Sequence, residues 1–490
     1  GLYRSAEQTL SILEQARLEP AQRAAFQREW GLVLLGQGRL TEADQAFDEG
    51  LETAYSAGLE RLAGALLNDK GTVAAARGAP AAATSLFGRA LESAQLSGDP
   101  VLAFTAALNR ARIAIELRDI GLFESSLDAA LNAGRQANSL DATQWLSIGS
   151  LQNAAVRDLG LPARWRKNAF DSYRQALERA SASGDDLAFS YAYGFIGGLY
   201  EDELRMEQAL QWTRQAEILA ISAGADEALY RWQWQSARIL RSEDANEDAI
   251  SAYRQAIATL GRLRPNLGQG EGVSFRERAA PVFFEYADLL LSRTHALDDE
   301  SAVERNLKEV RATLEQVKVA EVQEYFQDQC VQAAGGSTEL DTVGAGSAVI
   351  YPILLPDRTE LLVSLPSGLR QFTTPIGSAV LTQEVREFRR HIERYDFRTD
   401  YLRHARQLYR WLIEPLEADL VAAGIDTLVI VPDGPLRTVP LAALYDGQRF
   451  LVERFAVATT PGLTLTSPQP LERAQVNLFA GGLTEGCLLY

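Results

Sequence analysis

The sequence predicts an α-solenoid of helix hairpins followed by an α/β domain. Two observations lead to this fold class. A pattern of small and larger residues recurs about every 40 residues through the first half of the chain. Near the end, the uncharged stretch Leu428–Pro432 has the composition of a buried strand, with three β-branched side chains. Nearly everything before it has a helical pattern, so the two architectures follow one another along the chain.

Bulk composition indicates a folded chain with more than one core. Its 490 residues exceed the size of a single core, and 47% hydrophobic residues at 23% charge is too apolar for a disordered chain. The net charge of −17 repels phosphate backbones, so we expect no nucleic-acid partner. No apolar run approaches the roughly 20 residues needed to span a bilayer, so we expect no membrane segment.

Cysteine usage and the first residue bear on the compartment. Cys330 and Cys487 cannot form a disulfide framework or a zinc cluster. They fit a reducing compartment, and we expect a cytoplasmic protein. Because the chain begins with Gly1 rather than methionine, we expect a fragment in which a signal peptide would be invisible, and export stays open.

The repeat lies between about residues 20 and 265. A small residue is followed after four positions by a larger, often aromatic residue, after seven by another small one, and usually after eight by an apolar one. The spacing between the first members is 40, 40, 46, 40 and 40 residues. The third copy is less clean, and the fifth is weaker because Trp212 supplies its aromatic group. The copies begin at Ala43, Ala83, Phe123, Ala169, Ala209 and Ala249.

This spacing lays the pattern along one helix face, and the small residues let a neighbouring helix approach closely. Turns such as "GQGRLTEA" and "ARGAPAAA" precede the anchors, so each unit is a helix hairpin. The array resembles the tetratricopeptide repeat family, with slightly lengthened helices. We interpret Phe47, Phe87, Tyr173 and Tyr253 as core between repeats, rather than as a cofactor pocket. The resemblance implies a protein or peptide partner in the repeat groove.

Two segments invite a ligand-binding interpretation that we reject. "YRWQWQSARIL" from Tyr230 is the most aromatic segment, but Trp232 and Trp234 fall on different sides of a helix, which favours packing over ligand stacking. "RPNLGQGEG" from Arg264 contains Gly-x-Gly-x-Gly. No strand precedes it and no Gly-Lys-Ser/Thr follows, so we interpret it as a loop, not a phosphate site.

Two helices, about 275–292 and 301–328, connect the array to the α/β domain, and Ser301 with Glu304 predicts a capping box at the start of the second. "AVIYPILLP", "TELLVSLP" and "GLRQFTTPI" then predict an antiparallel meander. A helical stretch from about 382 to 424 contains Pro415, which should kink or split it. We expect domains at 1–265 (repeat array), 266–335 (linking helices) and 345–490 (α/β domain).

The strand Leu428–Pro432 ends in the turn Pro432-Asp433-Gly434-Pro435, in which Gly434 can take a positive φ. Asp446-Gly447 predicts a second turn, "RFLVERFAVATT" alternates like a strand, and Val476–Gly481 predicts another. A helix that feeds such a strand is typical of a doubly wound sheet, in which ligands bind beyond the carboxyl ends of the strands.

Three blocks, "LYRWLIEPLEADL", "LVIVPDGPLRTVPLAALYDGQRFLVERFAVATTPGLTL" and "LFAGGLTEG", resemble the CHAT domain, a caspase- and separase-like cysteine peptidase domain that typically follows tetratricopeptide repeats. The resemblance is most specific at Pro432, Asp433, Gly434, Leu436, Pro440 and Leu444. It implies a caspase-like fold in which a histidine, downstream of the Pro-Asp-Gly block, activates a cysteine after the next strand.

The chain does not visibly supply that pair. His295 sits in a polar loop, and His391 and His404 lie on charged helical stretches upstream of the block, where we expect them at the surface. Cys330 and Cys487 lack the expected context. We therefore assign no catalytic, cofactor-binding or metal residue, interpret Asp433 as turn-stabilising, and expect the α/β domain to be incomplete, truncated before the His–Cys dyad.

Two functions stay open: a repeat array that controls a caspase-like cysteine endopeptidase, and a non-enzymatic scaffold or signalling adaptor with an inactive peptidase-like domain. A weaker third, a repeat-containing regulator acting on nucleic acid, is disfavoured by the acidic charge.

Overall fold

The computed structural model describes residues 6–11, 17–137, 140–267, 275–326, 346–393 and 400–465. Within these ranges the chain forms two compact units, residues 1–289 and 290–490, and the boundary falls within one helix. The loop predicted from 264 to 272 begins too early, because the helix Asn246–Leu267 continues through its first residues. The rest of that loop, the strand predicted at 476–481, Cys330 and Cys487 lie outside the described residues.

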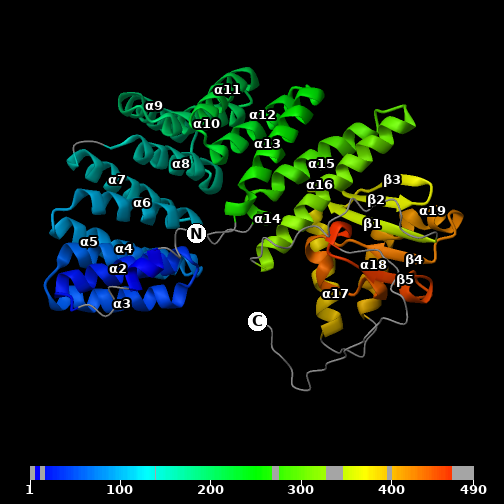
Figure 1. Cartoon of the computed structure of the whole chain (residues 1–490), viewed down its shortest axis with the longest axis horizontal. Coiled ribbons are helices and arrows are strands. Elements are labelled where there is room, and N and C mark those ends of the chain that lie inside the picture. The colour runs from blue at the N-terminus through cyan, green and yellow to red at the C-terminus, as the bar shows by residue number, and fades with distance from the viewer. Residues whose placement is uncertain are drawn as a thin grey trace. The chain divides into compact units, whose positions relative to one another are not determined.

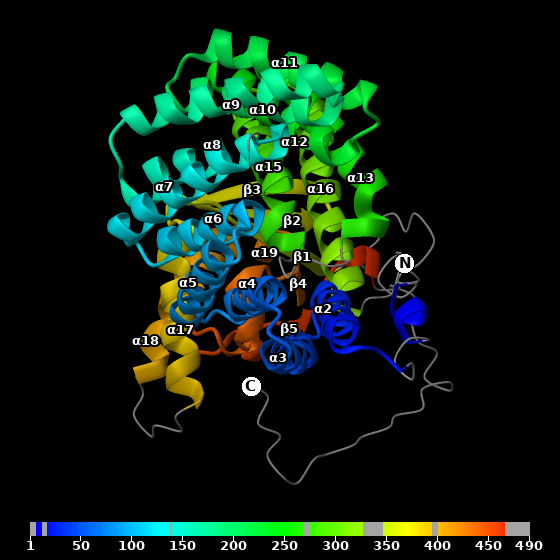
Figure 2. The same ribbon diagram turned by 90° about the vertical axis from the view of Figure 1, so that its left-hand side faces the viewer.

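The first unit is a stack of helix hairpins, as the 40-residue period predicts (Figure 1). The array begins with six helices of 17 residues each, and three-residue turns join them. They are α2 (Pro20–Gly36), α3 (Leu40–Ser56), α4 (Glu60–Ala76), α5 (Pro80–Leu96), α6 (Pro100–Glu116) and α7 (Ile120–Gln136). Figure 2 shows them followed by later helices in chain order. These are α8 (Ala142–Leu159), α9 (Arg164–Ser183), α10 (Asp186–Asp202), α11 (Met206–Ser222), α12 (Asp226–Ser242) and α13 (Asn246–Leu267).

The repeated residues lie on the second helix of each hairpin and form the core. Phe47, Phe87, Tyr173 and Tyr253 are each at most 2% exposed, which confirms their interpretation as packing residues. The rings fit against small residues of a first helix: a Cβ added at Gly31 would lie 2.4 Å from the Phe47 ring, and one at Gly71 would lie 2.5 Å from the Phe87 ring. Close approach of two helices therefore depends on glycine opposite an aromatic ring.

The aromatic segment on α12 also packs, as predicted. Trp232 is 3% exposed, and its indole N–H donates to the Ser190 hydroxyl at 3.0 Å. Its ring fits against Gly194, where an added Cβ would lie 2.4 Å away. Trp234 lies on another face and donates to Glu285 Oε2 at 2.6 Å. The two indoles thus serve two different helix contacts.

The connection between the units is helical: α14 (Phe275–Arg278), α15 (Ala280–Thr294) and α16 (Glu300–Phe326). The predicted capping box at Ser301 is wrong. The helix begins one residue earlier, and Asp299 accepts the backbone N–H of Ser301 at 3.2 Å and its hydroxyl at 2.6 Å. An Asp before the first helical residue caps it as well as a Ser would, so the motif was placed too late in the sequence.

The second unit is built on a five-stranded mixed sheet with the order β3-β2-β1-β4-β5. The meander is antiparallel as predicted, whereas β4 and β5 add in parallel to β1. The strands are β1 (Ser347–Leu354), β2 (Thr359–Leu365), β3 (Gly368–Thr374), β4 (Thr427–Ile430) and β5 (Ala456–Thr459). The predicted alternating stretch before β5 is a 3₁₀ turn, η4 (Leu451–Glu453), so the strand is shorter than its pattern suggests.

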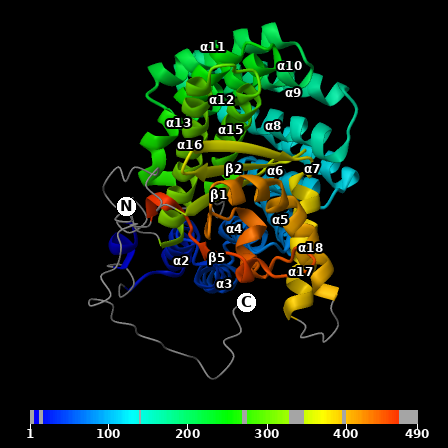
Figure 3. The ribbon, with the colours of Figure 1, turned by 90° about the vertical axis from the view of Figure 1, so that its right-hand side faces the viewer.

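Helices cover both faces of this sheet. Ile350 of β1 belongs to a core shared with α17 (Ser378–Glu393) and α18 (Asp400–Leu412), which Figure 3 shows side by side. The next residue, Tyr351, points to the opposite face and reaches α16. This alternation follows from the two-residue period of a strand. The helical stretch predicted from 382 to 424 comprises more than one helix, since α17 ends at Glu393 and α18 begins at Asp400. Pro415 lies in the 3₁₀ turn η1 (Glu414–Leu416), which separates α18 from α19 (Glu417–Ala422), as predicted.

Candidate functional site at the carboxyl edge of the sheet

The parallel strands β4 and β5 end at the same edge, where a cavity of about 400 Å³ opens. Its walls are the residues that follow the two strands and one face of α16. They are Lys318, Glu321, Val322, Pro432, Leu436, Arg437, Val439, Thr459, Thr460 and Pro461. This is where a parallel α/β sheet binds its ligands, because the loops that follow the strands converge there. The turn takes the predicted form, with φ of +50° at Gly434, and continues into η2 (Gly434–Thr438).

A buried ion pair fixes the loop after β4. Lys318 Nζ donates to Asp433 Oδ1 at 2.6 Å, and the two side chains are 4% and 6% exposed. The same ammonium group lies 3.3 Å from the carbonyl oxygen of Pro432. Burial lowers the pKa of Lys318, while the negative charge of Asp433 acts in the opposite direction. The carboxylate of Asp433 is therefore engaged in an ion pair with α16.

Arg437 brings a second cation to the same turn. Its Nη2 donates to Glu321 of α16 and lies 3.6 Å from Asp433 Oδ1, while its Nε donates to the carbonyl oxygen of Pro432 at 3.2 Å. Asp433 thus lies between two cations, Lys318 and Arg437. Lys318 belongs to α16, and Arg437 pairs with Glu321 of α16, so both cations connect the turn to this helix. We expected Asp433 to stabilise the turn. In the structure its carboxylate contacts Lys318 and so connects the turn to α16.

The loop after β5 is fixed by Glu315, one helical turn before Lys318. This carboxylate is 3% exposed and accepts four hydrogen bonds. Tyr351 Oη donates at 2.8 Å, the backbone N–H groups of Leu463 and Thr464 each donate at 3.0 Å, and the Thr464 hydroxyl donates at 2.7 Å. Burial and the neighbouring Glu315 charge raise the pKa of Tyr351. One face of α16 therefore holds both loops that border the cavity.

Sequence reasoning missed Glu315 and Lys318, since neither belongs to a motif. One signal was available: Leu314, Val317 and Ala320 mark the buried face of α16, and the two charges fall beside them. Charged residues at buried helical positions need partners of opposite charge or several donors, which would have suggested a network.

The three histidines lie elsewhere in the second unit. His295 is exposed, as predicted, with its ring 3.4 Å from the Gln371 amide. His391 is half-buried. The surface prediction is wrong for His404, which is 3% exposed, because Glu384 of α17 faces it and its Nδ1 lies 2.7 Å from Glu384 Oε1. At the cavity, the described residues include neither a histidine nor a cysteine.

A second cavity, of about 670 Å³, lies in the first unit. Its apolar lining comes mainly from the beginnings of α4 and α6, through Leu59, Leu62, Val101 and Leu102. Charged and amide groups border it. Arg61 Nε donates to Asp99 Oδ2 at 2.6 Å, and Arg28 Nε donates to Asp69 Oδ2 at 2.6 Å. Asn109 Nδ2 donates to Asn68 Oδ1 at 3.0 Å, so a polar row links the first helices of three hairpins.

Residues 402–485 match the family model of the CHAT domain. The chain carries a CHAT domain. The described part of the match begins in α18 and includes β4, the Pro-Asp-Gly turn and β5, so the cavity lies largely within CHAT sequence. Its α16 wall precedes the match.

Two solved structures show low similarity to this chain. One is a Signal Transduction ATPase with Numerous Domains (STAND) protein with a tetratricopeptide repeat sensor, from Pyrococcus horikoshii, at 13% identity, TM-score 0.43, and coverage of 66% of this chain and 49% of that one. The chain thus spans about half the length of that protein. The apo form of RapI is also 13% identical, with TM-score 0.38 and coverage of 55% and 91%. No curated protein matches the sequence.

Proposed function

We propose that the repeat array binds a protein or peptide partner and is attached to a caspase-like cysteine endopeptidase domain, whose carboxyl-edge loops are held by α16. The observation that carries the binding part is the cavity in the repeat array, where apolar side chains lie beside fixed polar groups. Extended peptides use such surfaces, because apolar pockets supply affinity and aligned polar groups select sequence.

The endopeptidase part rests on the CHAT match and on the organisation of the sheet edge. A caspase-like enzyme needs two loops after parallel strands to hold a base and a nucleophile in register. Glu315 and Lys318 fix the loops after β5 and β4, which border the same edge of the sheet. None of the helices in the described residues is long and apolar enough to cross a membrane. A reducing, cytoplasmic location would keep a cysteine nucleophile active.

The second candidate is a non-enzymatic scaffold or signalling adaptor. One observation favours it: among the described residues, none of the three histidines lines the cavity at the sheet edge. Incubation of the full-length protein with a peptide library, with and without substitution of its candidate nucleophilic cysteine, separates the two. Endopeptidase activity that disappears in the cysteine variant supports the enzyme, whereas intact peptides at high protein concentration support the scaffold.

Partner binding is tested with a displayed random-peptide library, followed by affinity measurements on the enriched peptides. Leu62→Asp places a carboxylate in the apolar part of the cavity, and we expect at least a tenfold loss of affinity, about 1.4 kcal/mol or more. Leu96→Asp is the matched control, because Leu96 is 84% exposed at the end of α5 and does not line the cavity. Equal affinities for both variants would contradict this assignment of the binding surface.

A further inference from the structure

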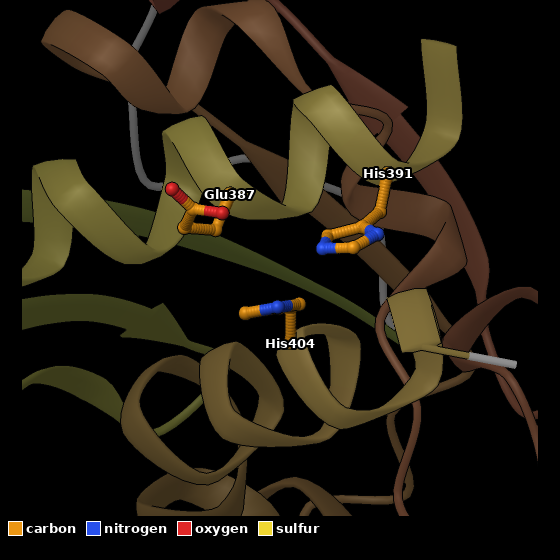
Figure 4. A group of neighbouring side chains, drawn as sticks. All are labelled: Glu387, His391 and His404. Carbon is orange, nitrogen blue, oxygen red and sulfur yellow. The ribbon is translucent and has the colours of Figure 1, made fainter. Parts of the chain in front are cut away.

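Two helices of the second unit bring two imidazoles and a carboxylate together, away from the sheet edge. Glu387 and His391 lie four residues apart on α17 and therefore on one helix face, and His404 comes from α18. Their nitrogen and oxygen ligand atoms all lie within 4.8 Å of one another. Figure 4 shows His391 descending from α17 toward His404, with Glu387 one turn away on the same helix.

We propose that Glu387, His391 and His404 form a binding site for a divalent transition metal, with Zn²⁺ as the ion that the ligand set suits best. Two imidazoles and one carboxylate make a common zinc ligand set, with a water completing the tetrahedron. Harder cations such as Mg²⁺ and Ca²⁺ prefer all-oxygen sites, so they are disfavoured here.

The surroundings of His404 are those of a metal ligand. Its side chain is 4% exposed, and its Nδ1 lies 2.7 Å from Glu384 Oε1. With the proton on Nδ1, that carboxylate fixes the ring orientation, and Nε2 presents its lone pair. A carboxylate on the other ring nitrogen is the usual outer partner of a zinc-bound histidine, because it sets the tautomer and strengthens the ligand.

Two arginines adjoin the cluster, and the site accommodates both. Arg390 Nη2 contacts Oε2 of Glu387. We therefore assign the other oxygen of this carboxylate, Oε1, to the metal. Arg403 Nη2 lies 3.3 Å from His404 Nε2, a long contact that a metal ion would displace. Neither arginine needs to leave the helix surface, since both side chains are long and can extend into water.

Metal binding requires the cluster to contract. Zinc–ligand bonds of about 2.0–2.1 Å place tetrahedral ligand atoms about 3.4 Å apart. The imidazole rings of His391 and His404 are stacked, with centroids 5.1 Å apart and an interplanar angle of 21°. His404 is held by Glu384, whereas Glu387 and His391 are only half-buried and can rotate. The metal would then clamp α17 to α18, two helices that contribute Phe388 and Leu408 to the core beneath the sheet.

The test is titration of the metal-free full chain with Zn²⁺ by calorimetry, and with Co²⁺ by visible absorption, which reports coordination geometry. We expect one ion per chain and a rise in the thermal midpoint with Zn²⁺. His391→Ala and Glu387→Gln should each lower affinity at least tenfold. Glu384→Gln should lower it about 10–100-fold, as an outer partner does. His295→Ala, which removes an exposed histidine outside the cluster, should bind as the parent chain does.

His391 and Glu387 are half-buried, so their variants keep the test valid even if replacing the buried His404 prevents folding. Circular dichroism of each variant confirms that it is folded before titration. The proposal is overturned if the folded chain binds no Zn²⁺ at micromolar concentration, or if His391→Ala binds it as tightly as the parent. It is also overturned if His295→Ala loses the ion instead.

Discussion

The two units of this protein are stabilised by different kinds of contact. In the repeat array, aromatic rings such as Phe47 and Phe87 fit against glycines, and the same contact recurs with the period of the sequence. In the CHAT-containing unit, the charged side chains of Glu315 and Lys318 hold loops that follow two strands. The first kind of contact tolerates loss of one copy, since each repeat touches only its neighbours. The second is less tolerant, because removal of a partner leaves a buried charge with less compensation.

The largest expected effect comes from removing one charge of the buried pair. Lys318→Met should destabilise the second unit by about 3–5 kcal/mol, because Asp433 would remain buried after losing the ammonium group at 2.6 Å, with Arg437 at the longer distance of 3.6 Å. Local stability can be followed by hydrogen exchange of peptides from α16 and β4, with peptides from α3 as the internal reference.

Two further variants sharpen this test. Lys308→Met changes a half-exposed lysine on the same helix, paired with Glu304, and should alter stability by less than about 1 kcal/mol. Lys318→Met combined with Asp433→Leu should recover much of the loss, since neither member of the pair is left buried without the other. A double variant as unstable as the single one would show that the pair itself, and not an orphaned carboxylate, determines stability.

The next largest effect is expected in the repeat array, where a Gly→Ala substitution should lower stability at one glycine and raise it at another. Gly71→Ala should destabilise by about 1–3 kcal/mol, because its Cβ would lie 2.5 Å from the Phe87 ring. Gly88→Ala, also within a helix, should stabilise by about 0.5–1 kcal/mol, because its Cβ would meet only Arg110, at 4.0 Å. Urea unfolding of the full chain measures both. Equal shifts would mean that the ring-to-glycine contact is not what limits the approach of the helices.

What could be predicted from the sequence follows the same division. The array was predictable because its contacts are local and periodic, down to the buried rings at Phe47 and Tyr253. The meander, the turn at Gly434 and the break at Pro415 were predictable because each depends on residues next to one another. In each case the local pattern determines the local structure.

The site was not predictable, since its partners are far apart in sequence. Lys318 and Asp433 are separated by 115 residues, and Glu315 and Leu463 by 148. No periodicity connects such pairs. His404 was misplaced at the surface for the same reason: its neighbours in sequence are charged, but its packing is determined by Glu384, 20 residues away on α17.

A smaller effect concerns the hydroxyl of Tyr351, which donates to the buried Glu315. Tyr351→Phe should lower stability near neutral pH by about 1 kcal/mol, since Glu315 keeps three other donors. The pKa of Tyr351 is raised in the folded state, so its contribution is present below the unfolded value near about 10 and is lost as pH rises above it. Stability of the parent chain should therefore fall more steeply between about pH 9 and pH 11 than that of Tyr351→Phe.

Tyr173 provides the comparison from the repeat array. Burial raises its pKa to about 12, and its hydroxyl lies at the long distance of 3.5 Å from Ser150 Oγ. Tyr173→Phe should flatten the same alkaline decline while leaving stability near neutral pH almost unchanged, because no strong hydrogen bond is lost. Phenolate absorbance during the pH titration provides a further check: in the parent chain, the signal that each variant lacks should appear only above the usual tyrosine range or as the chain unfolds.

The smallest expected effect tests whether charge matters in the array at all. Arg262 forms a two-pronged pair with Asp226, through Nη2 at 2.7 Å and Nε at 2.9 Å, yet the side chains are 55% and 33% exposed. Water and salt screen such a pair, so Arg262→Ala should leave the urea midpoint unchanged within error, at low and at high salt. If this variant unfolded as readily as Lys318→Met, geometry rather than burial would govern the ion pairs of this protein, and the distinction between the two units would disappear.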